Sequence, residues 1–264
     1  MSGKAPLRII VCLKHAVDES ELRVDASGHP ILQGAQARMS AFDRNAVEEG
    51  VSIKEKAGGT VTALSLGTED VRKSIKEALA MGCDRAILVN SSKYLDALAT
   101  SYYLARAVQR AAPYDLMICS EGASDTYDGL VGPMLAQWLD LPFMGYVRRT
   151  ELRGDGSLQC ELAMEESVEV VEARFPSVIS VVSEINSPRY PTLLQIMQAS
   201  KKPIEEFPLD SLAPGPGEAA APEAAVRVLD TTAQSMSRKK ILFEGSPEES
   251  ASKLLEALKS EGVL

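Results

Sequence analysis

Two stretches decide the fold: residues 8–13, Arg-Ile-Ile-Val-Cys-Leu, and residues 60–66, Thr-Val-Thr-Ala-Leu-Ser-Leu. Each is a short run dominated by apolar and β-branched side chains, which is typical of strands buried on both faces of a parallel sheet. Between them a helical pattern begins at Asp43 and ends at Gly58-Gly59. Strands joined by a crossover helix lie parallel, so the two stretches predict neighbouring strands of one parallel sheet.

The same alternation continues along the chain. Further strands are expected at 85–89 and 115–119, with helices at about 71–79, 96–111 and 133–139. Right-handed crossovers put helices on both faces, which predicts a doubly wound, mostly parallel, Rossmann-like α/β sheet. Residues 143–182 read as antiparallel strands that extend this sheet.

The C-terminal third has a different composition. Residues 208–235 are rich in Ala, Pro, Gly and Glu and predict a tether, so the α/β domain is expected to span 1–207. The arm 236–264 contains the helix start Ser246-Pro247-Glu248-Glu249, with Ser246 as the cap and the helix ending near Ser260. Its apolar stripe of Leu254, Leu255 and Leu258 must be buried against either its own domain or another protein chain, and we expect another chain.

Composition excludes several classes of partner. The 264 residues carry a formal net charge of −9 and a pI near 5.0, which argues against nucleic acid. The apolar run at 7–13 is too short for a membrane span, so no membrane insertion is expected. Four cysteines without C-x-x-C spacing predict reduced thiols and a cytoplasmic location.

Motifs for common catalytic chemistry are absent from the sequence. No G-x-G-x-x-G follows the first strand, and neither a P-loop lysine motif nor a G-x-S-x-G elbow occurs. The two histidines, His15 and His29, have no paired cysteines and cannot build an ordinary zinc or iron site. We therefore expect neither catalytic residues nor a bound metal.

The best local candidate for a binding site is the loop 121–133, which follows a strand at the ligand edge of such a sheet. Its small residues allow close approach of the backbone, and the amides of 129–132 open a helix whose positive end favours an anion. Asp125 and Asp128 can accept hydrogen bonds from ribose hydroxyls or can simply cap turns. A flexible Gly and Ser loop is the alternative that composition leaves open.

A longer stretch carries a family resemblance. Ile185-Asn186-Ser187-Pro188-Arg189-Tyr190-Pro191-Thr192-Leu193, continuing to Glu205, resembles the signature of the electron transfer flavoprotein β subunit. Segments 11–18, 46–49, 63–67, 78–85 and 124–132 follow in the family's order, and Gln234–Arg238 resembles the tail of members that serve bacterial amine dehydrogenases. The resemblance spans nearly the whole chain and implies an adenine nucleotide α-hydrolase-like fold.

The resemblance also implies cofactors and a partner. In this family an α subunit carries most contacts to the redox FAD, and the β subunit holds AMP and faces the flavin, so the chain is expected to be an electron carrier subunit of a heterodimer. Matched position by position, the cofactor residues are Cys12, Phe42 (near the flavin), Ser65, Leu66, Asp125, Thr126, Asp128, Gly129, Leu130 and Val131.

This chain departs from the family pattern at two places. Ser40-Ala41 stands where Asn-Pro is usual, and Gly129, Leu130 and Val131 replace polar side chains of the phosphate loop. Phosphate contacts must then come mainly from backbone amides.

Residues 186–203 match the family's recognition loop, which holds flavin-containing dehydrogenases. The expected docking residues are Pro188, Arg189, Tyr190 and Leu193. The prolines stiffen the loop, Thr192 can cap a short helix, and Leu193 near its start is the expected anchor. An ordinary core leucine is the alternative interpretation of Leu193.

Two other functions remain open. Val131-Gly132-Pro133 favours a bifurcating β subunit, whose pocket holds a second FAD and meets NADH. A stand-alone adenine-nucleotide sensor on the same fold is the other, although a tethered amphipathic arm argues against it.

Overall fold

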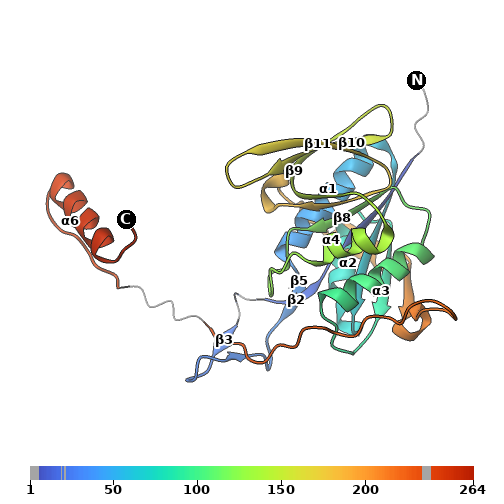
Figure 1. Ribbon diagram of the computed structural model, residues 1–264, viewed down its shortest axis with the longest axis horizontal. Coiled ribbons are helices and arrows are strands. Elements are labelled where there is room, and N and C mark those ends of the chain that lie inside the picture. Colours follow the sequence, from blue (N-terminus) through green and yellow to red (C-terminus); the bar gives the residue numbers. More distant parts are fainter. Residues whose placement is uncertain (1–5, 19, 21, 234–238) are drawn as a thin grey trace. The chain divides into compact units, whose positions relative to one another are not determined.

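The computed structural model describes residues 6–18, 20, 22–233 and 239–264 (Figure 1). The chain divides into two units, Met1–Arg23 with Ile31–Asp230, and Val24–Pro30 with Thr231–Leu264. The segment Gln234–Arg238, whose sequence resembles the tails that serve amine dehydrogenases, lies outside the described residues.

The first unit is built on a nine-stranded sheet in the order β11-β10-β9-β12-β8-β1-β6-β7-β13. Every neighbouring pair from β9 to β13 in this order is parallel, whereas β10 pairs antiparallel with both β9 and β11. The expected doubly wound, mostly parallel sheet with an antiparallel extension is confirmed. The strands are β1 (Leu7–Cys12), β6 (Gly59–Gly67), β7 (Arg85–Asn90), β8 (Leu116–Ser120), β9 (Phe143–Leu152), β10 (Ser157–Ala163), β11 (Val168–Arg174), β12 (Ser177–Val181) and β13 (Ile204–Pro208).

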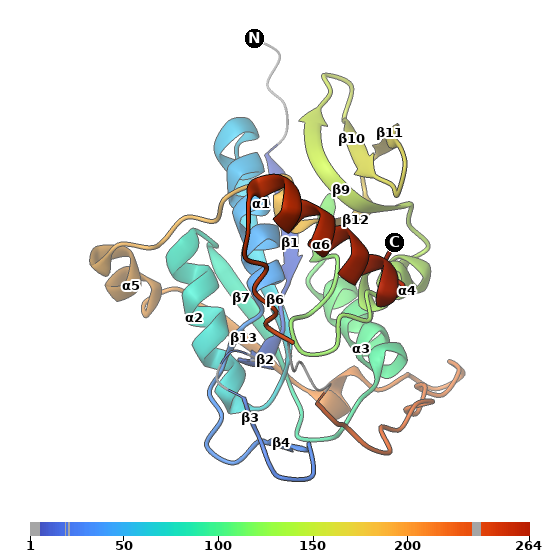
Figure 2. The ribbon, with the colours of Figure 1, turned by 90° about the vertical axis from the view of Figure 1, so that its left-hand side faces the viewer.

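Helices cover both faces of this sheet, as Figure 2 shows. On one face, α1 (Ala41–Ala57) and α2 (Arg72–Met81) share an apolar cluster with Ile9 and Val11 of β1. On the other, α3 (Ala97–Arg110) and α4 (Val131–Leu139) share a second apolar cluster with Ile10 and Cys12. Successive side chains of β1 thus enter two separate apolar clusters, which explains why the whole strand is apolar.

The antiparallel region is shorter than the sequence pattern indicates. Only β9, β10 and β11 form it (Figure 1), and β12 instead lies between β8 and β9, parallel to both. All five residues of β12 are buried. This uninterrupted burial, in contrast to the alternation of apolar residues with Glu169 and Glu172 in β11, fits a central strand covered on both faces.

Short elements lie between β1 and α1 in the sequence. The strand pair of β2 (His15–Val17) with β5 (Ala37–Met39) belongs to the first unit, whereas the pair of β3 (Arg23–Val24) with β4 (Pro30–Ile31) has residues in each unit. The first unit also contains the 3-10 helices η2 (Glu69–Val71), η3 (Ser183–Ile185) and η4 (Leu209–Leu212), and α5 (Leu193–Ala199) leads to the edge strand β13.

The start of the expected tether belongs to the α/β unit. Leu209 and Leu212 of η4 are buried in the same apolar cluster as α3. Farther along, the backbone N–H groups of Ala225 and Val226 donate to one carboxylate oxygen of Asp96, at 2.6 and 3.0 Å. Residues 213–230 form no helix or strand among the described residues, but they are attached at this point.

The second unit contains α6 (Pro247–Ser260). The Ser246 hydroxyl accepts from the N–H of Glu249, whose carboxylate accepts in return from the N–H of Ser246, so the expected cap is confirmed. Within this helix no residue is buried, and Leu254 and Leu255 are exposed.

Candidate functional site

The direction of chain growth reverses between β1 and β8. From β1 the chain adds β6 and β7 on one side, then returns to place β8 and β12 on the other. The loops that leave the carboxyl ends of β1 and β8 therefore run to opposite faces and open a crevice, where doubly wound proteins bind their ligands. The loop after β8 is the predicted loop 121–133.

Asp43, in the first turn of α1, joins these two strand ends. Its carboxylate accepts from the N–H of Lys14, after β1, at 2.7 Å, and lies 2.5 Å from the hydroxyl of Ser120, at the end of β8. That hydroxyl is also 2.8 Å from the carbonyl of Gly122. A hydroxyl has a single hydrogen, so a protonated Asp43 carboxyl that donates to Ser120 frees that hydrogen for Gly122 and satisfies both contacts fully. Burial raises the pKa of Asp43 to about 7, which agrees with this arrangement.

The loop after β8 is held in a defined conformation. The ammonium of Lys14 pairs with Asp125 at 2.7 Å, and the N–H of Ser124 donates to the Ser40 hydroxyl at 3.1 Å. Phe42 lies against Tyr127, with ring centroids 5.2 Å apart. Loops from β1, α1 and β8 are therefore interlocked at the crevice, in contrast to the flexible loop that composition allows.

The beginning of α4 has the character of an anion site. Leu130 caps the helix without a side-chain hydrogen bond, and Val131 is the first helical residue. Gly129 adopts φ +63°, and a Cβ there would lie 2.9 Å from the carbonyl oxygen of Glu121. Asp128 and Leu130 beside it are exposed, and the first turn of a helix carries N–H groups without an intrahelical partner, which suit an anion bound through the backbone.

The other predicted cofactor residues lie at the ends of neighbouring strands. Cys12 is buried at the end of β1. The neighbouring Cys12 thiol and burial hold the pKa of the Cys119 thiol well above its usual value. Ser65 is buried, and its hydroxyl donates to the carbonyl of Leu13 at 2.7 Å, so it ties β6 to β1. Leu66 beside it is half-buried.

Sequence reasoning missed four polar residues of this crevice: Lys14, Ser40, Asp43 and Ser120. Lys14 and Ser120 stand at the ends of predicted strands, and Asp43 begins the first predicted helix. Their positions could have identified them as site residues, because strand ends and helix starts meet at the ligand edge of this fold.

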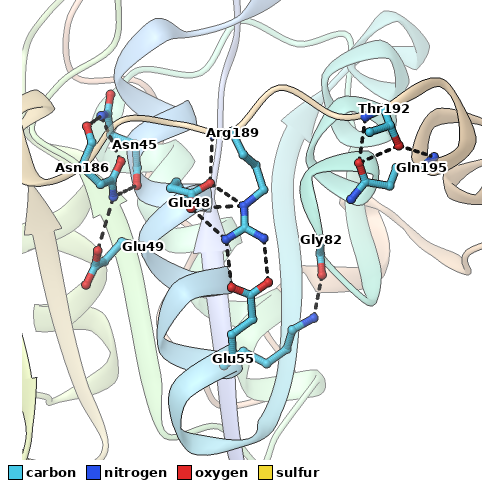
Figure 3. Close-up of polar contacts among 10 residues, drawn as sticks. Asn45, Glu48, Glu49, Glu55, Gly82, Asn186, Arg189, Thr192 and Gln195 are labelled. Carbon is cyan, nitrogen blue, oxygen red and sulfur yellow. Dashed lines mark hydrogen bonds and ion pairs between the residues drawn. The ribbon is translucent and has the colours of Figure 1, made fainter.

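The predicted docking residues belong to a different part of the first unit, between η3 and α5. Tyr190 and Leu193 are 94% and 75% exposed, which contradicts the interpretation of Leu193 as a core residue. Pro188 is half-buried. Thr192 caps α5 through a reciprocal pair of hydrogen bonds with Gln195, as expected (Figure 3). Arg189 points back toward α1, where Glu48 and Glu55 accept its hydrogen bonds (Figure 3).

A surface hollow of about 520 Å³ lies at the opposite edge of the sheet, at the amino ends of β1 and β6. Its lining includes Arg8 and Asp115, whose side chains form an ion pair with each other at 2.7 Å. The charges of these two residues are thus paired with each other, and the hollow lies at the edge opposite to the one where this fold binds ligands.

The described part of the chain holds no cluster of three or more His, Cys, Asp or Glu residues that could bind a metal. Within those same residues, no helix is both long and apolar enough to cross a membrane. All four cysteines are free and buried.

A doubly wound sheet with a polar cluster at its switch point defines the chain as an α/β protein of the class that binds its ligand at the carboxyl edge. Residues 31–212 match the family described as electron transfer flavoprotein domain. The chain belongs to this family.

Relatives named electron transfer flavoprotein subunit beta match over most or all of their length. The protein of Thermoanaerobacterium thermosaccharolyticum is 32% identical over 262 residues, which cover 98% of this chain and all of the relative. The protein of Bacillus subtilis is 32% identical over 258 residues, 97% of this chain and 98% of the relative. That of Clostridium acetobutylicum is 34% identical over 209 residues, 78% and 80% of the two chains.

The chain is accordingly a β subunit of an electron carrier and not an enzyme in its own right. Membership of a flavoprotein family implies association with a flavin.

Proposed function

We propose that this chain binds AMP at the crevice between β1 and β8, completes an FAD site together with an α subunit, and docks flavin-containing dehydrogenases through residues 186–203. Electrons then pass from a docked dehydrogenase to the FAD of the heterodimer. Four free, buried cysteines support a cytoplasmic location.

The observation that carries the proposal is the interlocked crevice. Lys14 with Asp125, and Asp43 with Ser120, hold the loop after β8 against the end of β1. This leaves the amides at the start of α4 available for the phosphate, in keeping with the apolar side chains of Leu130 and Val131. Asp125 and Asp128 are exposed beside the same helix and can accept hydrogen bonds from ribose hydroxyls.

Two other features support the shared flavin site and docking. Phe42, half-buried against Tyr127 at the same crevice, offers an aromatic face beside the proposed AMP. The apolar side chains of Leu193, Leu194 and Met197 are more than half exposed on the short helix after the prolines, as a docking surface requires.

The test is to purify the chain with its α subunit from the native host, then extract and weigh the bound small molecules. We expect one FAD and one AMP per heterodimer, and a colourless β subunit when it is expressed alone. Two flavins per heterodimer would contradict AMP binding and support the bifurcating alternative, in which this crevice holds a second FAD and meets NADH. A yellow subunit in isolation would contradict a shared flavin site.

The stand-alone nucleotide sensor has less support. Membership of an electron carrier family argues against it, and so does the exposed apolar stripe of α6 in the second unit. A monodisperse chain that binds AMP and never associates with a flavoprotein subunit would favour the sensor.

A further inference from the structure

The segment between η3 and β13 is attached to the helices beneath it at its beginning, in its middle and at its end. At its beginning, the side-chain amide of Asn186 donates to the backbone carbonyl of Asn45 at 3.0 Å, and that of Asn45 donates to the carbonyl of Asn186 at 2.9 Å. The exchange is reciprocal, so it fixes the position of Asn186 on α1 (Figure 3).

The middle attachment is Arg189. Its Nε donates to Glu48 at 2.8 Å, its Nη1 to Glu55 at 2.6 Å, and its Nη2 to both carboxylates at 2.9 Å (Figure 3). The backbone N–H of the same residue also donates to Glu48 at 3.1 Å. All three guanidinium nitrogens are therefore used inside the chain. The hydrogen bonds from Arg189 lower the pKa of Glu55.

The end attachment is Lys202, which follows α5. Its ammonium donates to the carbonyls of Leu79 and Cys83, at 2.8 and 2.6 Å. Leu79 lies in the last turn of α2 and Cys83 just beyond it. The ammonium therefore donates hydrogen bonds to carbonyls at the C-terminal end of a helix, where carbonyls lack intrahelical partners and a positive charge is favoured.

The acceptors on α1 are spaced so that they can bind Asn186 and Arg189 from one face of the helix. Asn45, Glu48 and Glu55 are three and seven residues apart, which puts them on one face of a helix. Glu48 is almost fully buried, with 11% of its side chain exposed, whereas Glu55 is 52% exposed. A buried carboxylate needs its partner, and bidentate Arg is the side chain best suited to bridge two carboxylates.

Between Arg189 and Lys202 the segment presents its apolar side chains to solvent. Tyr190, Leu193, Leu194, Ile196 and Met197 are all at least half exposed. Exposed apolar side chains on a seven-residue helix would not hold one position without attachment, because so short a helix is marginal by itself.

We propose that Arg189 is a positioning residue: bound to Glu48 and Glu55, it fixes Tyr190 and α5 in a preformed docking geometry and does not itself contact the partner. This inference rests on the proposed function, because it assumes that dehydrogenases dock through residues 186–203. It also changes the expected role of Arg189, which the family resemblance groups with the residues that dock. A preformed surface loses less conformational entropy when a partner binds.

The test uses two variants in the full chain and in its complex with the α subunit. Arg189→Lys keeps a positive charge beside the buried Glu48 but cannot bridge both carboxylates, and Glu55→Gln weakens the exposed half of the bridge. The matched control is Arg149→Lys, in a surface ion pair with Glu161 between β9 and β10. The readouts are amide hydrogen exchange, the thermal melt, and the concentration dependence of electron transfer from the cognate dehydrogenase.

In both variants we expect amides of α5, such as that of Ile196, to exchange about tenfold faster while those of β1, β6 and β8 are unchanged. The half-saturating concentration of dehydrogenase should rise about threefold to tenfold with an unchanged maximal rate, since only the preformed geometry is lost. The Arg149→Lys control should change neither quantity.

Unchanged exchange in α5 for both variants overturns the inference. If Arg189→Lys accelerates exchange throughout the chain, that variant has destabilised the whole fold. The exchange of α5 in Glu55→Gln then decides by the same criterion. Faster exchange with unchanged half-saturation also overturns the positioning role, and Leu193→Ala then shows which idea has failed. If Leu193→Ala weakens docking, only the role of Arg189 is wrong. If it has no effect, docking through this surface is wrong as well.

Discussion

Replacing Asp43 by asparagine is expected to stabilise the fold at neutral pH and to remove much of its dependence on pH. The introduced side-chain amide can accept from the N–H of Lys14 through its oxygen and donate to the Ser120 hydroxyl through its nitrogen. It thereby reproduces the hydrogen bonds of the protonated carboxyl, which satisfy both contacts of the Ser120 hydroxyl fully.

The magnitude follows from the pKa of Asp43, which burial raises from 3.8 to about 7. The folded chain holds this proton more tightly than the unfolded chain does. The resulting stability is fully present below pH 3.8 and is lost as the pH rises through about 7. A difference of about three pKa units corresponds to about 4 kcal/mol of unfolding free energy at low pH, and all of it is lost by pH 8, about 2.7 kcal/mol of it between pH 5 and pH 8.

The assay is urea denaturation of the full chain at pH 5 and pH 8, followed by the fluorescence of Trp138, the single tryptophan. The variant should gain stability relative to the native sequence as the pH rises, by about 2.7 kcal/mol over this interval. Asp210→Asn, at a carboxylate that is 93% exposed, is the control and should show no such gain. A difference that stays constant with pH, or a variant less stable at pH 8, would refute a protonated Asp43.

Three further outcomes are expected. Replacing Leu193 by Ala should leave flavin content and the thermal melt unchanged and weaken docking by about 2 kcal/mol, roughly thirtyfold in half-saturating dehydrogenase; a lowered melting temperature with unchanged half-saturation would contradict this. Deleting residues 236–264 should abolish the heterodimer while circular dichroism shows an intact α/β unit, and elution as a heterodimer would reject it. Gly129→Ala should cost about 1 kcal/mol in stability and also weaken AMP binding by calorimetry, whereas Gly156→Ala, at φ +86° with open space around it, should cost stability alone.

Much of the fold was predictable because its signals are local. The apolar runs of β1 and β6 and the glycines that end α1 identify elements without reference to distant residues. The same holds for Ser246 and Thr192, whose hydroxyls cap the helices that follow them. Strand order is different, since β12 lies between β8 and β9 through pairings that no local pattern encodes.

The location of the site was predictable from the sequence, but the contacts between its side chains were not. The loop after β8 was found because strand ends gather at one edge. The role of Asp43 depends on Lys14 and Ser120, which come from separate strands and meet it only in the folded chain. The role of Arg189 was not predictable for the same reason. Its position in the family signature indicates docking, whereas its hydrogen-bond acceptors lie on α1, 141 and 134 residues away along the sequence.

The insertion of β12 beside β8 has a consequence during synthesis. Until residues 177–181 leave the ribosome, one edge of β8 presents unpaired backbone groups. At about 5–20 residues per second, this interval lasts on the order of several seconds. A nascent chain with an open sheet edge is a substrate for chaperones and a template for wrong strand pairing, so slow translation between β8 and β12 should favour aggregation.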